Sequence, residues 1–240
     1  MSRLFLEEHC GLIIFNTLLC SGALRSTGFF MSICYTILMN QKILLSLGIV
    51  LVISGFFFFK PSVKITNYPS SGTTFVAFGD SLIEGVGATP GNDLVSQLSK
   101  KIGTPIINLG VAGNTTSQGL ARVNQIARYK PKIVFVLLGG NDYLKKIPRT
   151  ETAQNIERIV IEIQRMGAVV MLLGVQGGIL TDPYEDMFED IAERYGTVYV
   201  PNVLDGLVAD MRYMSDAVHP NDIGYMKIVD KIYPYITKVL

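Results

Sequence analysis

The sequence predicts an α/β fold in which helices cover both faces of a parallel sheet. Short runs that are apolar nearly throughout, as buried parallel strands are, occur at residues 74–78, 106–109, 133–138, 169–173 and 198–200. Helical patterns alternate with these runs, which implies right-handed β-α-β units in a doubly wound sheet. The stretch from 74 to 240 is long enough to bury one core as a single domain.

Helices are expected between the strands, at residues 93–101, 117–129, 150–166, 184–195 and 222–238. The third of these has the clearest periodicity, because apolar side chains recur in it at i, i+3, i+4 and i+7: Ile156, Ile159, Val160 and Ile163. Thr150 is a candidate N-cap for this helix, and Gly167 stands where a helix ends.

Composition excludes several classes of function for the globular part. The 240 residues include 21 Lys and Arg against 20 Asp and Glu, so the charge gives no reason to expect a nucleic-acid partner. The three cysteines, Cys10, Cys20 and Cys34, all precede the apolar run at 43–59. The globular part therefore has no disulfide framework, no thiolate nucleophile and no cysteine metal site, and no metal or cofactor is expected.

The N-terminal region predicts a membrane anchor. Residues 43–59 are uncharged and apolar between Lys42 and Lys60, with a length near the lower limit for a membrane span. The end of this run is a poor signal peptidase site, which favours an uncleaved anchor over 39–60. Residues 61–73 are then expected to form a linker. The domain at 74–240 would be extracytoplasmic, or secreted if the segment is cleaved.

Residues 1–38 leave two alternatives open. One alternative is that they are upstream sequence included through a misassigned start. Alternatively, the mostly apolar stretch at 11–38 forms a second membrane-associated helix, and two spans would return the domain to the cytoplasm.

The globular part contains a single histidine, His219, which is the one candidate for the general base of a serine hydrolase. Asp216 lies three residues before it, where its carboxylate can reach Nδ1–H while Nε2 faces outward. Ser81 follows the first strand, at the edge where doubly wound sheets bind ligands. The alternative for the pair is a surface histidine capped by an aspartate. The alternative for the serine is a tight turn in which Asp80 or Ser81 caps a helix.

Two further loops end at the same predicted edge, and each could be only a turn. Functionally, Asn141 after the third strand would direct its amide toward the serine. Gly113 after the second strand would let the backbone approach and present an N–H. With the N–H of Ser81 these groups make three donors for one oxyanion.

Four segments in this order resemble the motifs of the SGNH hydrolases, also called the GDSL lipase/esterase family. They are Gly79-Asp80-Ser81-Leu82, residues 108–116, Gly139-Gly140-Asn141-Asp142 and Asp216-Ala217-Val218-His219-Pro220. The resemblance covers about residues 74–240. The segment Gln118-Gly119-Leu120-Ala121-Arg122 is similar to the compact arylesterase, acyl-CoA thioesterase I and lysophospholipase L1 group.

The resemblance implies a three-layer, flavodoxin-like sandwich with five parallel strands in the order 2-1-3-4-5. It also implies that Ser81 is the nucleophile, His219 the base and Asp216 its partner, with Ser81, Gly113 and Asn141 forming the oxyanion hole. The predicted function is a serine esterase that hydrolyses carboxylic esters or thioesters through an acyl-enzyme.

Two other functions remain open. One is a carbohydrate O-acetylesterase that acts on cell-wall or extracellular sugars with the same triad. The other, of a different class, is a membrane-tethered binding module without catalysis. The segment 174–183 is expected to line the acyl site through Ile179 and Leu180, because it follows the fourth strand at the ligand edge.

Overall fold

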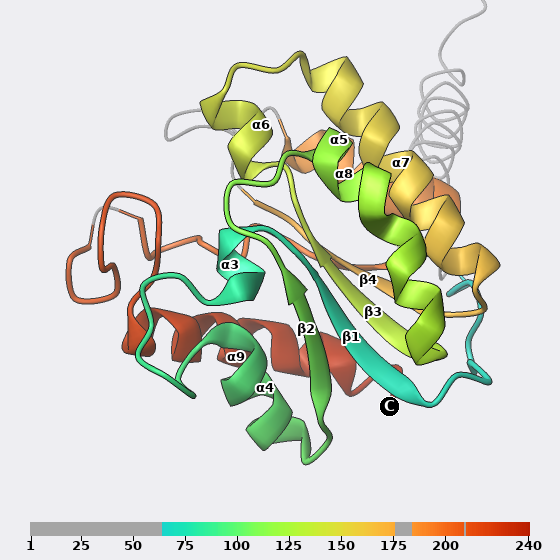
Figure 1. The fold of residues 1–240 in the computed structure, drawn as a ribbon, viewed down its shortest axis with the longest axis horizontal. Helices are drawn as coiled ribbons and strands as arrows, with labels where there is room; N and C mark the ends of the chain where they lie inside the picture. Colours follow the sequence, from blue (N-terminus) through green and yellow to red (C-terminus); the bar gives the residue numbers. More distant parts are fainter. Residues whose placement is uncertain (1–63, 176–183, 209) are drawn as a thin grey trace, which may run out of the picture. The chain divides into compact units, whose positions relative to one another are not determined.

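A parallel sheet organises the domain. The structure, a computed structural model, describes residues 64–175, 184–208 and 210–240. In this part of the chain, five parallel strands form one sheet in the order β2-β1-β3-β4-β5 (Figure 1). The strands are β1 (Thr74–Gly79), β2 (Ile106–Gly110), β3 (Pro131–Leu137), β4 (Val169–Leu173) and β5 (Val198–Val200). The predicted strands and the strand order implied by the resemblance are therefore confirmed.

Helices cover both faces of this sheet, as the predicted three-layer arrangement requires (Figure 1). On one face lie α4 (Leu94–Ile102) and α9 (Asp222–Ile236), which contact each other. On the other face α7 (Arg149–Arg165) packs between α5 (Thr116–Arg122) and α8 (Glu185–Tyr195). The loops that follow the strands all begin at the carboxyl ends of this parallel sheet, so polar residues in those loops can meet there.

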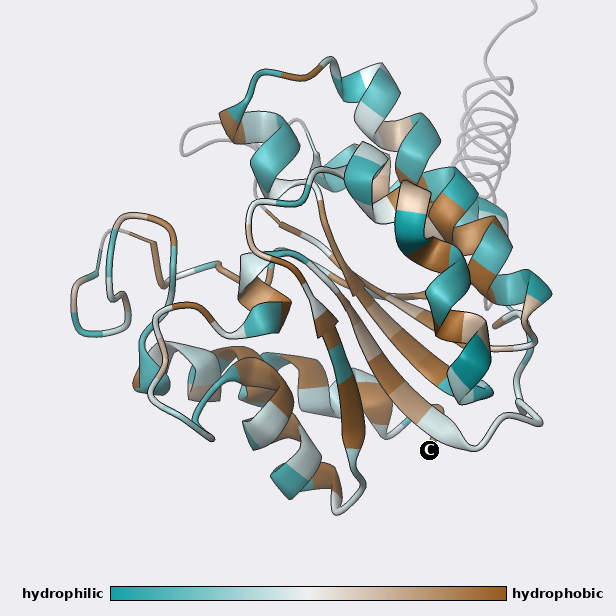
Figure 2. Ribbon diagram, viewed as in Figure 1, coloured by the Kyte–Doolittle hydropathy of each residue, from teal (hydrophilic) through white to brown (hydrophobic). Residues whose placement is uncertain are grey.

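The sheet forms the core because both of its faces are covered. Every residue of β4 is buried, and in β3 only Lys132 is partly exposed. Figure 2 shows these central strands as continuous hydrophobic ribbons. The edge strand β2 is more open, and its Asn108 is exposed. Burial on both faces explains why the strand sequences are apolar throughout instead of alternating.

Two helices differ from the prediction in their limits. The pattern predicts one helix over 117–129, but the chain forms α5 and then a 3₁₀ helix, η1 (Val123–Tyr129). Pro131 starts β3 and disfavours α-helical geometry at Lys130, which instead adopts a φ of 50°. Thr150 is not the N-cap of α7: that position belongs to Pro148, whose carbonyl accepts the N–H of Thr152 at 3.1 Å.

Two short helices follow strands β1 and β3 and are not among the helices predicted from periodicity. They are α3 (Ser81–Glu84) after β1 and α6 (Gly140–Leu144) after β3. With four and five residues they are too short to show a helical period in the sequence. Helix α3 begins at Ser81, the predicted nucleophile, and α6 begins at Gly140, directly before the predicted oxyanion donor Asn141.

The segment 64–73, predicted as part of a linker, is hydrogen-bonded to the domain. The N–H of Thr66 donates to the carbonyl of Gly196 at 2.9 Å. The amide of Asn67 donates to the carbonyl of Gln164, and Ser70 Oγ donates to that of Gly167, both at 2.7 Å. Gly167 and Gly196 precede β4 and β5. The chain therefore enters the domain at the amino ends of the strands, opposite the end where the carboxyl-terminal loops meet.

The predicted anchor at 39–60 and the extension at 1–38 lie outside the described residues, and both stay predictions. Within the described ranges, no helix is long and apolar enough to cross a membrane.

Candidate active site

Ser81 lies at the turn between β1 and α3. Asp80 is the N-cap of α3, and its Oδ1 accepts the N–H of Leu82 at 3.1 Å. Gly79 is required just before the turn, because a Cβ there would lie 2.3 Å from the carbonyl oxygen of Leu137. The capping alternative is thus correct for Asp80, while the same turn brings the Ser81 hydroxyl to the wall of a pocket.

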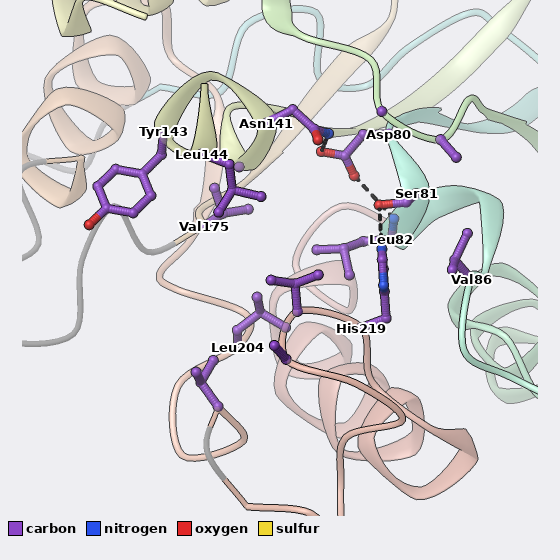
Figure 3. Close-up of a pocket in the computed structure, with 16 residues that line it drawn as sticks. Asp80, Ser81, Leu82, Val86, Asn141, Tyr143, Leu144, Val175, Leu204 and His219 are labelled. Atoms are coloured by element: carbon purple, nitrogen blue, oxygen red, sulfur yellow. Dashed lines mark hydrogen bonds between the residues drawn. The ribbon is translucent and has the colours of Figure 1, made fainter. Parts of the chain in front are cut away.

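The loop between β5 and α9 brings His219 to this serine (Figure 3), and Asp216 of the same loop lies beside the histidine. Nε2 of His219 lies 3.1 Å from Ser81 Oγ, and Nδ1 lies 2.7 Å from Asp216 Oδ2. The other carboxylate oxygen of Asp216 accepts the N–H groups of Val218 and His219, each at 2.8 Å. These hydrogen bonds, above all the one from His219, lower the pKa of Asp216 to about 2. The carboxylate is therefore ionised throughout the neutral and mildly acidic range.

The histidine loop closes on itself, which fixes the position of the ring. The N–H of Ser215 donates to the carbonyl of His219 at 2.8 Å, and Met214 forms a β-bridge with Pro220. Gly87, with a φ of 94°, packs on this loop: a Cβ there would lie 2.4 Å from Ser215 Oγ and 3.2 Å from His219 Cβ. A side chain at this glycine would therefore displace the loop that carries the histidine.

The two further oxyanion candidates lie at the same pocket. Gly113, with a φ of 76°, and Asn141 both line it together with Ser81. Nδ2 of Asn141 donates to the carbonyl of Asn114 at 3.1 Å and, over a longer 3.4 Å, to Asp80 Oδ2. The amide is thus held beside Ser81, with its weaker hydrogen bond on the side of Asp80.

A buried carboxylate fixes the helix that carries Asn141. Asp142 is fully buried and accepts the N–H of Thr116 at 2.8 Å and its hydroxyl at 2.5 Å. The hydroxyl of Thr152 donates to the same carboxylate at 3.4 Å. Asp142 therefore joins α6 to α5 and α7, which holds the adjacent Asn141 at the pocket.

Sequence reasoning missed the electrostatic character of Asp80. This side chain is 2% exposed, and burial raises its pKa from 3.8 to about 7, against the opposing effect of its hydrogen bonds. Its place before the nucleophile was visible in the sequence, but its burial was not. It places a second titrating carboxyl beside Ser81 and Asn141.

The pocket has a volume of about 520 Å³ and a mostly apolar wall. Its apolar lining comes from α6 and from several loops and includes Val86, Tyr143, Leu144, Val175 and Leu204 (Figure 3), together with Val208 and Val218. Val175 belongs to the segment 174–183 that was expected to line the acyl site. Ile179 and Leu180 lie outside the described residues, so their role stays a prediction. Among the residues that the structure describes, no group of His, Cys, Asp or Glu could hold a metal ion.

Comparisons with known proteins agree with this geometry. A family model described as the GDSL-like Lipase/Acylhydrolase family matches residues 77–227. Esterase TesA of Pseudomonas aeruginosa is 26% identical over 179 residues, which are 70% of this chain and 89% of that protein. The thioesterase 1/protease 1/lysophospholipase L1 of Escherichia coli K12 is 24% identical over 168 residues, or 66% of this chain and 81% of that protein.

Solved structures show the same fold. The crystal structure of TesA superposes with a TM-score of 0.66 at 26% identity, covering 70% of this chain and all of the other. AlinE4, titled an SGNH-hydrolase family esterase, gives a TM-score of 0.54 at 32% identity and covers 71% of this chain and 99% of its own. The chain therefore belongs to the GDSL-like lipase/acylhydrolase family, the SGNH hydrolases, and is a carboxylic ester hydrolase.

Proposed function

We propose that the protein is a serine esterase that hydrolyses carboxylic esters or thioesters through an acyl-enzyme on Ser81. The observation that carries this proposal is the hydrogen-bonded series from Ser81 through His219 to Asp216, with distances of 3.1 and 2.7 Å. A nucleophile, a base within reach of it and a carboxylate that orients the base are the parts of acyl transfer by a serine.

In the first half-reaction, Nε2 of His219 takes the hydroxyl proton as Ser81 Oγ attacks the acyl carbonyl carbon. The oxyanion that forms accepts hydrogen bonds from the N–H groups of Ser81 and Gly113 and from the Asn141 amide. His219 then gives its proton to the departing alcohol or thiol, and Asp216 stabilises the cation in between. In the second half-reaction, a water molecule loses a proton to His219 and attacks the acyl carbon. The bond to Ser81 Oγ then breaks as His219 returns that proton to Oγ, which releases the acid and restores Ser81.

Asn141 has to change one hydrogen bond to take part. Its 3.1 Å bond to the carbonyl of Asn114 can persist, while the N–H on the side of Asp80 turns from a 3.4 Å contact to the oxyanion. The raised pKa of Asp80, near 7, favours the exchange, because a protonated carboxyl competes less for this N–H than a carboxylate does.

The apolar pocket wall supports an acyl group longer than acetyl as the bound portion of the substrate. Apolar surface of this kind stabilises a bound chain by about 0.8 kcal/mol for each buried CH₂ group. The relatives are named esterase, thioesterase, lysophospholipase and arylesterase. A carbohydrate O-acetylesterase would have less use for such a wall. A binding module without catalysis would have no need of the hydrogen-bonded Ser81–His219 pair.

A panel of p-nitrophenyl esters and acyl thioesters, from two carbons upward, tests this proposal on the full chain in detergent. We expect kcat/KM to rise with chain length beyond acetyl. Ser81→Ala should lower kcat on the order of 10⁴-fold or more. The exposed Ser117→Ala in α5 is the matched control and should keep full activity. Equal hydrolysis by Ser81→Ala and wild type would reject the assignment, and a preference for acetylated sugar would favour the acetylesterase.

A further inference from the structure

Arg122, the last residue of α5, occupies the space between the carboxyl ends of β1 and β2. Its guanidinium lies over the ring of Phe78, 4.3 Å from the ring centre. Its N–H groups donate to the carbonyl of Gly79 at 2.7 Å, to that of Leu109 at 2.9 Å and to Asn114 Oδ1 at 2.8 Å. The side chain is partly buried, so these hydrogen bonds are only partly replaceable by water.

Each acceptor lies within four residues of a component of the proposed oxyanion hole. The carbonyl of Gly79 closes β1, two residues before Ser81. The carbonyl of Leu109 lies near the end of β2, where the chain turns toward Gly113. Asn114 follows that glycine directly. One guanidinium therefore holds the backbone on both sides of the site.

Asn114 extends the connection to the third donor. Its side-chain oxygen accepts from Arg122, and its carbonyl accepts from the Asn141 amide at 3.1 Å. A displacement of Asn114 would therefore change the direction of the Asn141 amide. An oxyanion donor loses most of its effect when its direction is wrong, because the hydrogen bond has to meet the charge where it develops.

We propose that Arg122 is a positioning residue that aligns the oxyanion donors Ser81, Gly113 and Asn141 through the hydrogen bonds to Gly79, Leu109 and Asn114. The inference rests on the proposed esterase function. A planar guanidinium presents its donors in fixed directions and can satisfy all of these acceptors together, whereas the ammonium of a lysine is a point charge. A purely structural role in closing the strand ends is the alternative that an experiment has to exclude.

A double-mutant cycle on the full chain separates these roles. We expect Arg122→Ala to lower kcat by about 100-fold with KM within about threefold, because the lost interaction acts in the transition state. Arg122→Lys should lower kcat by about tenfold. In the Asn141→Ala background, Arg122→Ala should cost less than about fivefold, because the two residues act on the same oxyanion.

Controls make each result decisive. Arg128→Ala, at an exposed arginine six residues further along in η1, should match wild type in kcat. Thermal unfolding shows whether each variant folds, and Arg122→Lys carries the test if Arg122→Ala does not. Full activity in Arg122→Lys, or losses that simply multiply with those of Asn141→Ala, would overturn the positioning role. Activity that Ser81→Ala leaves intact would instead reject the proposed function.

Discussion

Two aspartates flank the Ser81–His219 pair, and the fold gives them opposite properties. Asp80 on the nucleophile side is 2% exposed, and burial raises its pKa to about 7. Asp216 on the base side has a side chain that is 53% exposed, and the hydrogen bond from His219 lowers its pKa to about 2. The same residue type is thus an anion in one position and a partly protonated acid in the other.

The difference follows from where each side chain gets its partners. Asp216 lies on a loop, accepts from His219 Nδ1 and from two backbone N–H groups, and remains open to water. Asp80 lies between β1 and α3, where burial removes water, and hydrogen bonds such as those from the N–H of Leu82 and the Asn141 amide do not offset that loss. The exposed carboxylate of Asp216 can stabilise a cation on His219. The partly protonated carboxyl of Asp80 places less negative charge beside the proposed oxyanion hole than an ionised one would.

Removing the carboxylate on the base side should have the largest effect. We expect Asp216→Ala to lower kcat by about 10³- to 10⁴-fold, because His219 loses both its orientation and the partner of its cation. KM should change little. Steady-state kinetics on a short p-nitrophenyl ester measures this. Asp205→Ala, an exposed aspartate earlier in the same loop, is the control. A loss smaller than tenfold would mean that Asp216 does not serve the histidine.

On the nucleophile side the expected effect is on stability. The raised pKa of Asp80 means that the folded state binds a proton that the unfolded state releases above pH 3.8. This contribution to stability is full at low pH and is lost as pH rises through about 7. Asp80→Asn does not titrate, so its free energy of unfolding relative to wild type should grow by about 4 kcal/mol between about pH 4 and pH 8.

Urea unfolding at several pH values measures this difference. The exposed Asp186→Asn in α8 is the control and should show no such growth. A constant difference between Asp80→Asn and wild type across the same range would contradict the raised pKa, and with it the contrast between the two aspartates.

The smallest expected effect concerns the support beneath the base. Tyr225 of α9 is fully buried, and its hydroxyl donates to the carbonyl of Val86 at 2.7 Å, next to the glycine that packs on the His219 loop. We expect Tyr225→Phe to lower the free energy of unfolding by about 1 to 2 kcal/mol, since a partly buried carbonyl loses its donor. The value of kcat should stay within about threefold. Tyr235→Phe, at a tyrosine near the end of the same helix, is the control. A loss of kcat beyond tenfold would mean that the position of His219 depends on this buried tyrosine. The contrast between a buried Ser81 side and an open His219 side would then fail.

Much of the site could be predicted because it depends on local features. His219 was the one histidine of the globular part, Asp216 stood at a spacing that reaches its ring, and Ser81 followed an apolar run. Thr150 shows the limit of such local reasoning, since the N-cap of that helix is Pro148, two residues earlier. The preference for a capping residue is smaller than the constraint that a proline imposes on the chain.

The connections between loops could not be predicted. Nothing near Arg122 in the sequence indicates that its guanidinium bonds the carbonyls of Gly79 and Leu109, which are 43 and 13 residues away. Nor does the sequence indicate that Asn141 is held between Asp80 and Asn114. These contacts exist only once the strands lie side by side in the order β2-β1-β3.

The sequence by itself determined the parallel sheet, the residue types of the site and their order along the chain. Those properties follow from local apolar patterning and from short spacings, which need no knowledge of distant residues. The tertiary structure decided the charge states of the two aspartates and the alignment of the donors around Ser81. Burial and hydrogen bonding set those properties, and both are created by segments far apart in the chain that meet at one edge of the sheet.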